Sequence, residues 1–347
     1  MRMSSSFFVC STVVLAASFL LSGCSNETST GSQSTSESSL TGSISIDGSS
    51  TVYPITAAVA EEFQKQNRQT RISVAYSGTG GGFKKFDAGE IDINNASRPI
   101  SKSEIEKAAA NGVDFIELPV AYDGLTIIVS PQNDWVDHIT TEELKQIWEP
   151  TSTVKTWSDV RPTWPNEPFQ LFGAGTDSGT FDYFTEAIMG KSGSCRSDYT
   201  ATEDDNLTVQ GVSGNKYALG FLGIAYFNEN TDKLRALPVK HGDLAPVEPS
   251  LQTVMTNTYA PLSRPLFIYV RNSSTQNPAV DAFVQFYLRD GAELVQEVGY
   301  IPLPEKAYEL VLKRYTDRVL GTAFVEREGG YVGMSIEQLL AQEAAHE

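Results

Sequence analysis

The stretch that decides the fold class is SISIDGSSTVYPITAAVAEEFQKQNRQTRISVAY, residues 43–76. Isoleucines alternate with polar residues over 43–47, which predicts a short strand, and a Gly-Ser-Ser-Thr loop follows at 48–51. Apolar residues then recur every four positions over 55–63, as on one face of a helix, before alternation returns over 71–76. The order strand, loop, helix, strand is typical of a parallel, doubly wound α/β sheet.

The same alternation of strands and helices continues along the chain. Capping-box spacing in Ser101–Glu104 and Thr140–Glu143 predicts the start of two helices. We expect strands over Ile91–Ile93, Phe115–Leu118, Leu125–Val129, Phe169–Phe172 and Leu266–Val270, and helices over Phe83–Phe86, Ser101–Ala110, Thr140–Ile147, Phe181–Ile188 and Val280–Tyr287. The sequence therefore predicts an α/β protein with mainly parallel sheets flanked by helices.

Length and charge limit the function. The chain has 347 residues, 40% of them hydrophobic and 20% charged, which is a globular composition that suits two lobes of about 100–200 residues each. It carries 26 Lys and Arg against 43 Asp and Glu, a net charge of −17. Such an acidic chain argues against a nucleic-acid partner. It does not argue against a small anion, which responds to local dipoles more than to distant charge.

The first 24 residues have the features of an export signal. The mostly apolar run Phe7–Leu21 is shorter than the roughly 20 residues of a membrane-spanning helix. It ends in Leu21-Ser22-Gly23-Cys24, which resembles a bacterial lipobox. That resemblance implies a cleaved signal peptide at 1–23 and lipidation of Cys24, including a palmitate-type acyl chain. The protein would then be anchored at the bacterial cell membrane, facing the periplasm or the cell exterior; an ordinary signal peptide or an uncleaved anchor is the alternative.

The segment that follows reads as a tether. Eleven of the seventeen residues from Ser25 to Thr41 are Ser or Thr, so residues 24–41 form a lipid-anchored linker that cannot bury a core. With Cys10 in the signal and Cys24 lipidated, Cys195 is left alone and no internal disulfide is expected. No Cys/His cluster has metal-ligand spacing, so we expect neither a metal nor a cofactor.

Three loops share one design, in which a strand ends, a loop rich in Gly, Ser and Thr follows, and a helix begins. They are Gly48–Thr51, Ser77–Gly82 and Gly173–Thr180. The start of a helix has unpaired N–H groups and a partial positive charge, which together attract anions. Arg98, between a strand end and Pro99, could add a planar fork that grips an oxyanion, or it could be an ordinary surface arginine. The pattern predicts a shared anion site, although each loop alone could be a plain helix cap.

Enzyme motifs are incomplete. Asp177-Ser178-Gly179-Thr180 matches the tetrapeptide of aspartic proteases, but the chain has no second copy. Gly190-Lys191-Ser192 lacks the first glycine of a phosphate-binding P-loop, because position 185 is Thr. The three histidines neighbour no candidate nucleophile in the sequence; they are His138, His241 and His346. We therefore expect no catalysis.

Several of these pieces, taken in order, resemble a known family: the substrate-binding lipoproteins of the high-affinity phosphate ABC transporter, the Pst system. The matching motifs are Asp47–Pro54, Tyr76–Gly82, Ala96–Ile100, Tyr122–Leu125, Gly175–Thr180 and Gly299–Pro304. The resemblance implies a periplasmic-binding-protein type II fold, with two α/β lobes joined by two crossing strands and the ligand in the cleft between them. It implies lobe I at 42–128 plus 262–317, lobe II at 129–261, and a C-terminal extension at 318–347.

Carried over residue by residue, the resemblance implies a phosphate site. Its members would be Ser50, Thr51, Thr79, Gly80, Ser97, Arg98, Asp123, Thr176, Asp177, Ser178, Gly179 and Thr180. The best-known branch of the family has Asp where this chain has Arg98, and Arg where it has Ala174. The carboxylate that accepts the phosphate proton must then come from elsewhere, and Asp123 and Asp177 are the candidates. Alternatively, Asp123 only pairs with Arg98.

The function that this resemblance implies is capture of inorganic phosphate outside the plasma membrane by hinge closure, followed by delivery to the membrane permease of a phosphate ABC importer. We expect a monomer. The alternatives are a carrier of another oxyanion such as sulfate or molybdate, a phosphate-sensing surface protein, or a hydrolase that uses Asp177 or Ser178. In the C-terminal extension, Ile336, Leu339 and Leu340 have helical spacing and either pack on the body or face a partner.

Overall fold

The computed structural model describes residues 40–176, 178–202, 204–324 and 334–344. The predicted signal peptide, Cys24 and nearly all of the linker lie outside these residues. The part of the chain from Ser39 onward is one compact unit, and it is the body described below. Within the described ranges, no helix is both long enough and apolar enough to cross a membrane.

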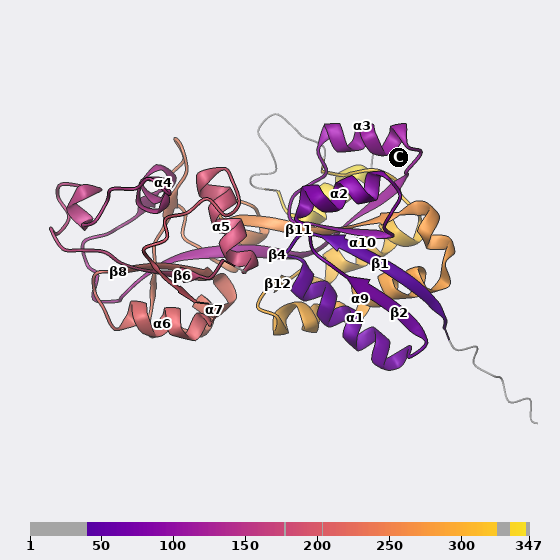
Figure 1. The fold of residues 1–347 in the computed structure, drawn as a ribbon, viewed down its shortest axis with the longest axis horizontal. Helices are drawn as coiled ribbons and strands as arrows, with labels where there is room; N and C mark the ends of the chain where they lie inside the picture. Colours follow the sequence, from indigo (N-terminus) through magenta and orange to yellow (C-terminus); the bar gives the residue numbers. More distant parts are fainter. Residues whose placement is uncertain (1–39, 177, 203, 325–333, 345–347) are drawn as a thin grey trace, which may run out of the picture. The chain divides into compact units, whose positions relative to one another are not determined.

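The first lobe is built on three parallel strands. β1 (Gly42–Gly48) lies between β2 (Thr70–Val74) and β3 (Ile93–Ala96) and pairs with both. These strands are followed in turn by α1 (Tyr53–Gln66), α2 (Thr79–Asp87) and α3 (Lys102–Ala110). In Figure 1, α2 and α3 lie on one face of the sheet and α1 on the other. The predicted strand–loop–helix units are confirmed, although β3 begins at Ile93 and not at Ile91.

Two long strands connect the lobes. β4 (Phe115–Val129) is buried along its whole length, and it pairs antiparallel with β11 (Ser263–Arg271). The sequence predicted two separate strands where β4 is continuous, because Pro119 and Gly124 lie between them. A register shift between Leu266 and Phe267 of β11 lets Pro119 stay in the ladder. The far half of β4 continues into the second lobe, where it pairs with β8 (Ala218–Gly223) and β9 (Arg235–Ala236).

The second lobe repeats the parallel arrangement. β6 (Gln170–Ala174) pairs in parallel with β8 and with β7 (Thr200–Thr202). A small sheet of β5 (Ile139–Thr140) and β10 (Val239–Lys240) lies apart from it. The helices of this lobe are α4 (Thr141–Trp148), α5 (Gly179–Met189), α6 (Asp205–Ser213), α7 (Ile224–Glu229) and α8 (Leu251–Met255). The pairs away from the crossing strands are parallel and those that the crossing strands make are antiparallel, so the whole sheet is mixed.

After β11 the chain returns to the first lobe. α9 (Pro278–Glu297) packs against α1, β12 (Ile301–Pro302) pairs with β4, and α10 (Glu305–Thr316) follows. The predicted capping boxes are present: the Glu104 carboxylate accepts a hydrogen bond from Ser101 N at 2.9 Å, and Glu143 accepts one from Thr140 N at 2.9 Å. The helices α6, α7, α8 and α10 were not predicted from the sequence. α7 and α8 are only 6 and 5 residues long, whereas α10 buries Ala307, Val311 and Tyr315 at helical spacing, a signal that the sequence did carry.

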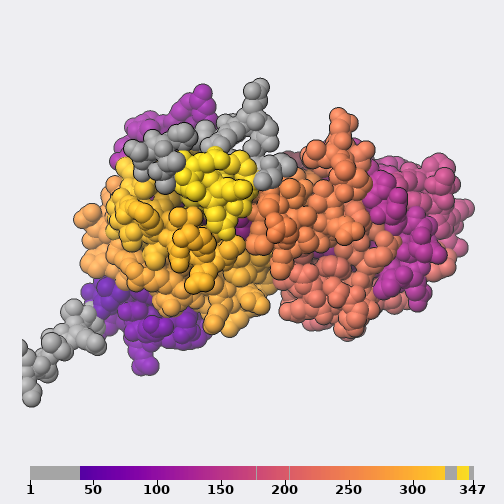
Figure 2. All heavy atoms as spheres, turned by 180° about the vertical axis from the view of Figure 1, so that it is seen from behind, coloured from indigo at the N-terminus to yellow at the C-terminus, as the bar shows by residue number. Residues whose placement is uncertain are grey.

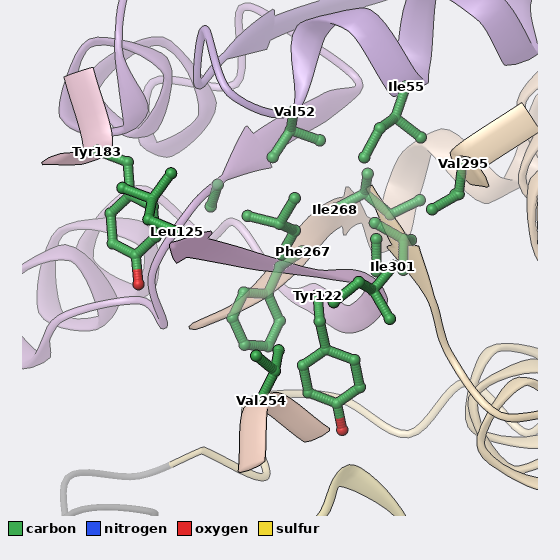
Figure 3. Close-up of a cluster of buried hydrophobic side chains, with 14 of the residues drawn as sticks. Val52, Ile55, Tyr122, Leu125, Tyr183, Val254, Phe267, Ile268, Val295 and Ile301 are labelled. Atoms are coloured by element: carbon green, nitrogen blue, oxygen red, sulfur yellow. The ribbon is translucent and has the colours of Figure 1, made fainter. Parts of the chain in front are cut away.

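One continuous hydrophobic core crosses the junction of the lobes. Figure 3 shows buried side chains that converge there from the two crossing strands and from the helices of both lobes. Those labelled are Val52, just before α1, Ile55 of α1, Tyr122 and Leu125 of β4, Tyr183 of α5, Val254 of α8, Phe267 and Ile268 of β11, Val295 of α9 and Ile301 of β12. This packing holds the crossing strands in place. The polar groups described below lie in the loops beside this core.

The C-terminal extension packs on the body. α11 (Ile336–Ala344) buries Ile336, Leu339 and Leu340 and lies against α10, where Arg314 forms an ion pair with Glu343. Figure 2 shows this last helix, in yellow, on the surface of the first lobe. Of the two alternatives left open by the sequence, the structure therefore supports packing on the body for the described part of the extension.

Asp87, the last residue of α2, is a buried carboxylate whose Oδ1 has no hydrogen-bond partner among the described residues. Burial, together with the nearby charge of Glu104, raises the pKa of Asp87 from 3.8 to about 6. Because the folded pKa lies above the unfolded one, ionisation of Asp87 destabilises the folded protein. The penalty is absent below pH 3.8, grows between pH 3.8 and about 6, and is complete above that.

We therefore expect Asp87→Asn to raise the melting temperature at pH 7.5 by about 2–4 °C and to leave it nearly unchanged near pH 4. Calorimetric melting of both proteins at the two pH values measures this. Asp290→Asn removes an exposed carboxylate of α9 and serves as the control, with no change expected at either pH. An equal shift at both pH values would show that ionisation of Asp87 is not the cause.

Candidate functional site

The structure brings the three Gly/Ser/Thr-rich loops together. A Cβ on Gly82 would lie 2.5 Å from Gly48 Cα, so the start of α2 packs directly on the first loop. Thr51, at the end of that loop, touches the second lobe: its Oγ1 lies 3.4 Å from the carbonyl oxygen of Gly179, the first residue of α5. The starts of α1, α2 and α5 therefore meet at the junction of the two lobes.

The helix starts in the first lobe have no capping side chain. The N-cap residues of α1 and α2 are Val52 and Gly78. In α1 the N–H of Tyr53 donates to the Ser49 carbonyl at 3.0 Å and Pro54 has no N–H, so the first turn of α2 is the one whose partial positive charge no capping side chain neutralises. α5 differs, because the Ser178 hydroxyl caps it by accepting a hydrogen bond from Thr180 N at 3.1 Å. Open N–H groups of this kind suit an anion.

Polar contacts hold the second loop in place. Thr79 Oγ1 accepts a hydrogen bond from Ser97 N at 3.2 Å, and the two hydroxyl oxygens are 3.0 Å apart. At the other end of the loop, Asp47 accepts a hydrogen bond from Ser77 Oγ at 2.7 Å and pairs with Lys85. Burial alone would raise the pKa of Asp47, but the contacts with Lys85 and Ser77 outweigh it and hold that pKa below its usual value. Asp47 is therefore an anionic anchor of the loop.

A hydrogen bond crosses from the first lobe to the second. Ser50 Oγ donates to Asp182 Oδ2 at 2.7 Å, and Asp182 also accepts from Ser192 Oγ at 2.6 Å. The sequence placed Ser50 in the site but gave no reason to single out Asp182. Position 182 lies in the first turn of α5, where an acidic residue is common because it interacts favourably with the helix dipole. Its presence in the sequence therefore indicates no particular function.

Arg264 of β11 is a candidate site residue that the sequence did not predict. Its guanidinium donates from Nη2 to Thr51 Oγ1 at 3.0 Å and stacks on the ring of Tyr183, with Cζ 3.5 Å from the ring centroid. Its Nη1 lies 3.4 Å from Glu186 Oε2. Arg264 thus touches the first loop from one side and α5 from the other, and its side chain is only 12% exposed. The sequence gives one weak indication of this role, which is that Arg264 precedes a proline at the start of a strand.

Asp123 faces Arg264 on the neighbouring strand. Asp123 Oδ2 and Arg264 Nε are 3.5 Å apart, and neither atom has a hydrogen-bond partner among the described residues. Burial raises the pKa of Asp123, and the positive charge of Arg264 opposes that rise. The alternative that Asp123 pairs with Arg98 is wrong, because the pairing register of β4 and β11 places it opposite Arg264.

Arg98 has a different partner. Its guanidinium donates two hydrogen bonds of 2.9 Å to the carboxylate of Glu104, and it lies over the ring of Phe83. Its side chain is 38% exposed, and Nη2 would be 3.8 Å from a Cβ on Gly80. Arg98 is therefore beside the start of α2, with two of its N–H groups already bound to Glu104.

Two of the predicted site residues lie at the edge of the described site or beyond it. Thr176 is exposed in a turn before α5. Asp177 lies outside the described residues, so its candidacy as a proton acceptor stays a prediction.

Two cavities flank the contact of Thr51 with Gly179. One, of about 310 Å³, is lined by groups that include Ser97, Arg98, Tyr183, Glu186 and Arg264. The other, of about 320 Å³, is lined by Ser50, Tyr53, Pro54, Tyr76, Ser178, Gly179, Thr180, Val298 and Tyr300. Because Thr51 bonds to Arg264 of the first cavity and touches Gly179 of the second, the helix starts and the buried guanidinium belong to one polar region.

Other reactive side chains are engaged elsewhere. Burial raises the pKa of the Cys195 thiol to about 11, which leaves it protonated at neutral pH. His138 lies 3.0 Å from Asp137, and His241 lies 3.2 Å from the Thr141 hydroxyl, both in the second lobe. Among the described residues, no group of three His, Cys, Asp or Glu could hold a metal ion.

Comparison with known proteins agrees with this architecture. The model of the PBP superfamily domain matches residues 32–290. Protein SphX of Synechococcus elongatus is 49% identical over 302 residues, which cover 86% of this chain and 88% of that protein. The phosphate-binding protein PstS of Staphylococcus saprophyticus is 37% identical over 298 residues, 86% of this chain and 90% of that protein.

A solved structure is similar over its full length. The crystal structure of a possible phosphate binding protein from Planctomyces limnophilus has a TM-score of 0.79 and 50% identity, and covers 81% of this chain and 100% of that one. This solved structure shares the fold of the body described above. The chain therefore belongs to the PBP superfamily, in the family of substrate-binding proteins that includes SphX and the phosphate-binding protein PstS.

Proposed function

We propose that this protein binds inorganic phosphate between its lobes and delivers it to the membrane permease of an ABC-type importer. One observation carries the proposal: the loop before α1 and the uncapped start of α2, both in the first lobe, meet the start of α5 beside the buried guanidinium of Arg264. N–H groups and a planar guanidinium are the donors that a tetrahedral oxyanion accepts from. The names of the PstS relatives and the possible phosphate binding protein point to the same ligand.

The proposed ligand set follows from the geometry and the family. Donors from the first lobe are Ser50, Thr51, Thr79, Gly80 and Ser97, and donors from the second lobe are Thr176, Ser178, Gly179 and Thr180, to which we add Arg264. Since the Ser50 hydroxyl donates to Asp182 and the Thr180 N–H to Ser178, Ser50 would contribute its N–H and Thr180 its hydroxyl. Arg98 stays in the set as a charge beside Gly80, although Glu104 takes two of its hydrogen bonds. An anion bound by both lobes stabilises the closed form, so binding drives hinge closure.

Asp123 is the proposed acceptor for the phosphate proton. Phosphate keeps a proton near neutral pH that sulfate lacks, and an ionised Asp123 beside Arg264 would accept its hydrogen bond and repel a bare dianion. A site built around such a hydrogen bond can reject the analogue that lacks it by roughly 10⁴–10⁵. Asp177 is the second candidate for this role.

The test is calorimetric titration of the protein, stripped of bound anion, with phosphate and then with sulfate. We expect tight phosphate binding with negligible sulfate binding in the wild type, and loss of most of that preference in Asp123→Asn. Equal binding of the two anions by the wild type would favour a general oxyanion carrier, and no binding of either would contradict the proposal. A preference that Asp123→Asn keeps and Asp177→Asn loses would assign the acceptor to Asp177.

The remaining parts of the proposal concern location and chemistry. We propose that Cys24 is lipidated and anchors a monomer at the outer face of the plasma membrane; palmitate labelling of the wild type and of Cys24→Ser tests the anchor. A binding protein of this kind releases its ligand unchanged. Turnover of a chromogenic phosphate ester would contradict this, and none is expected.

A further inference from the structure

Asn94 of β3 is a polar residue with an unusual environment. It is fully buried, and neither its amide oxygen nor its amide nitrogen has a hydrogen-bond partner among the described residues. An unpaired buried amide is destabilising, and folded proteins keep few of them. An apolar side chain of the same size would pack here without that penalty, so the amide calls for another explanation.

The position of the amide supplies one. Asn94 Oδ1 would lie 2.6 Å from a Cβ on Gly48 and 2.0 Å from a Cβ on Gly82. A Cβ on Gly82 would also come within 2.5 Å of Gly48 Cα. The amide oxygen and the two glycine backbones therefore meet at one point, where the first loop packs on α2. Only glycine fits at positions 48 and 82, and Gly48 also has a φ of +130°.

The residues after Asn94 tie the same two loops to β3. Asn95 accepts a hydrogen bond from Ser49 N at 2.9 Å through its carbonyl, and one from Thr56 Oγ1 at 3.0 Å through its side chain. Ser97 bonds to Thr79 at the start of α2. The end of β3 is thus the common support of the donors at 50–51 and those at 79–80.

We propose that Asn94 is a positioning residue of the anion site. Its amide, held between Gly48 and Gly82, sets the spacing of the donors of the first loop relative to those of α2. Asn94 itself does not contact the anion. The inference rests on the proposed function, because the donors that it spaces are those assigned to phosphate. A polar group that lowers stability where two functional loops meet is the kind of local conflict found at functional sites.

The decisive variant is Asn94→Leu, which keeps the branched shape of the side chain and removes the amide, although its methyl groups are larger than the amide atoms. We expect its melting temperature to stay within about 2 °C of the wild type, because loss of the unpaired amide offsets the tighter packing, and its phosphate affinity to fall about tenfold in calorimetric titration. The matched control is Thr208→Val in α6, which removes a buried polar group, the Thr208 hydroxyl, that also has no partner among the described residues. The control should gain stability and keep its phosphate affinity. An Asn94→Leu protein with wild-type affinity would overturn the inference.

A second variant and a second readout keep the test decisive. Asn94→Asp has the same shape as the wild-type side chain. Its loss of phosphate affinity relative to wild type should grow from pH 5 to pH 8, because the new carboxyl ionises next to the anion loops.

Hydrogen exchange of the amides at 48–51 and 79–82, measured without ligand, should be faster in Asn94→Leu than in wild type. If the wild type does not bind phosphate, the proposed function fails, and this exchange still decides the role of Asn94. Unchanged exchange would overturn it.

Discussion

Replacing Arg264 by methionine should weaken phosphate binding by about 10²–10³-fold, because truncating a buried, hydrogen-bonded charge at a binding site costs about 2–5 kcal/mol. The guanidinium contacts Thr51 of the first loop and stacks on Tyr183 of α5, so it supplies both positive charge and a link between the lobes. Arg264→Lys keeps the positive charge but lacks the planar guanidinium, so its phosphate affinity should lie between those of the wild type and Arg264→Met. Calorimetric titration with phosphate measures all three proteins.

The same substitution also affects stability, and the two effects must be separated. Without Arg264, the buried carboxylate of Asp123 loses its facing charge, which destabilises the fold by about 3 kcal/mol. The double variant Arg264→Met/Asp123→Asn removes both charges, so it should recover much of the stability without recovering phosphate affinity.

Arg271→Met is the matched control for Arg264→Met. Arg271 lies on the same strand, and it pairs with Asp92 and Ser274 away from the cleft. Its loss should lower stability while phosphate affinity stays within about threefold of wild type. If Arg264→Met binds phosphate as tightly as Arg271→Met does, Arg264 has no part in the site.

Much of the fold follows from local sequence signals. Strand alternation, the four-residue spacing of helix faces and two capping boxes gave the units around β1, α1, α3 and α4, because each of these signals acts within one element. The continuity of β4 did not follow. In the sequence, Pro119 and Gly124 suggest that a strand ends. The pairing of β4 with β11, with its shifted register, shows how both residues fit in one continuous strand.

The candidate site likewise has a part that local sequence patterns predicted and a part that depends on packing. The Gly/Ser/Thr-rich loops were predicted because a loop before a helix is a local pattern, and the structure brings their ends together at Thr51 and Gly179. Arg264, Asp182 and the partner of Arg98 were not predicted. Ser50 and Asp182 are 132 residues apart in sequence, so their hydrogen bond depends on how the lobes pack. The sequence could not decide whether α11 packs on the body or faces a partner, because its contact with α10 also depends on the tertiary packing.

Replacing Gly179 by alanine should weaken phosphate binding by about ten- to a hundredfold without lowering stability. A Cβ at this position would lie 2.8 Å from Thr51 Cα and 3.2 Å from Thr51 N, closer than packed atoms allow. Overpacking of this kind costs about 1–3 kcal/mol. Gly179 belongs to α5 and Thr51 to the first lobe, so opening the hinge relieves the clash at no cost to either lobe. Alanine also suits a helix better than glycine, and it keeps the backbone N–H.

The effect of Gly179→Ala is therefore on closure and not on the donors. Phosphate should dissociate faster from this variant, and small-angle scattering at saturating phosphate should report a larger radius of gyration than for wild type. Gly291→Ala in α9 is the control, because a Cβ there meets the Tyr287 ring at 3.3 Å and Val59 at 3.7 Å, both within the first lobe. It should bind phosphate as the wild type does. If Gly179→Ala also binds and closes like wild type, the close approach of Thr51 to Gly179 is absent from the phosphate-bound form, and the anion separates the two helix starts.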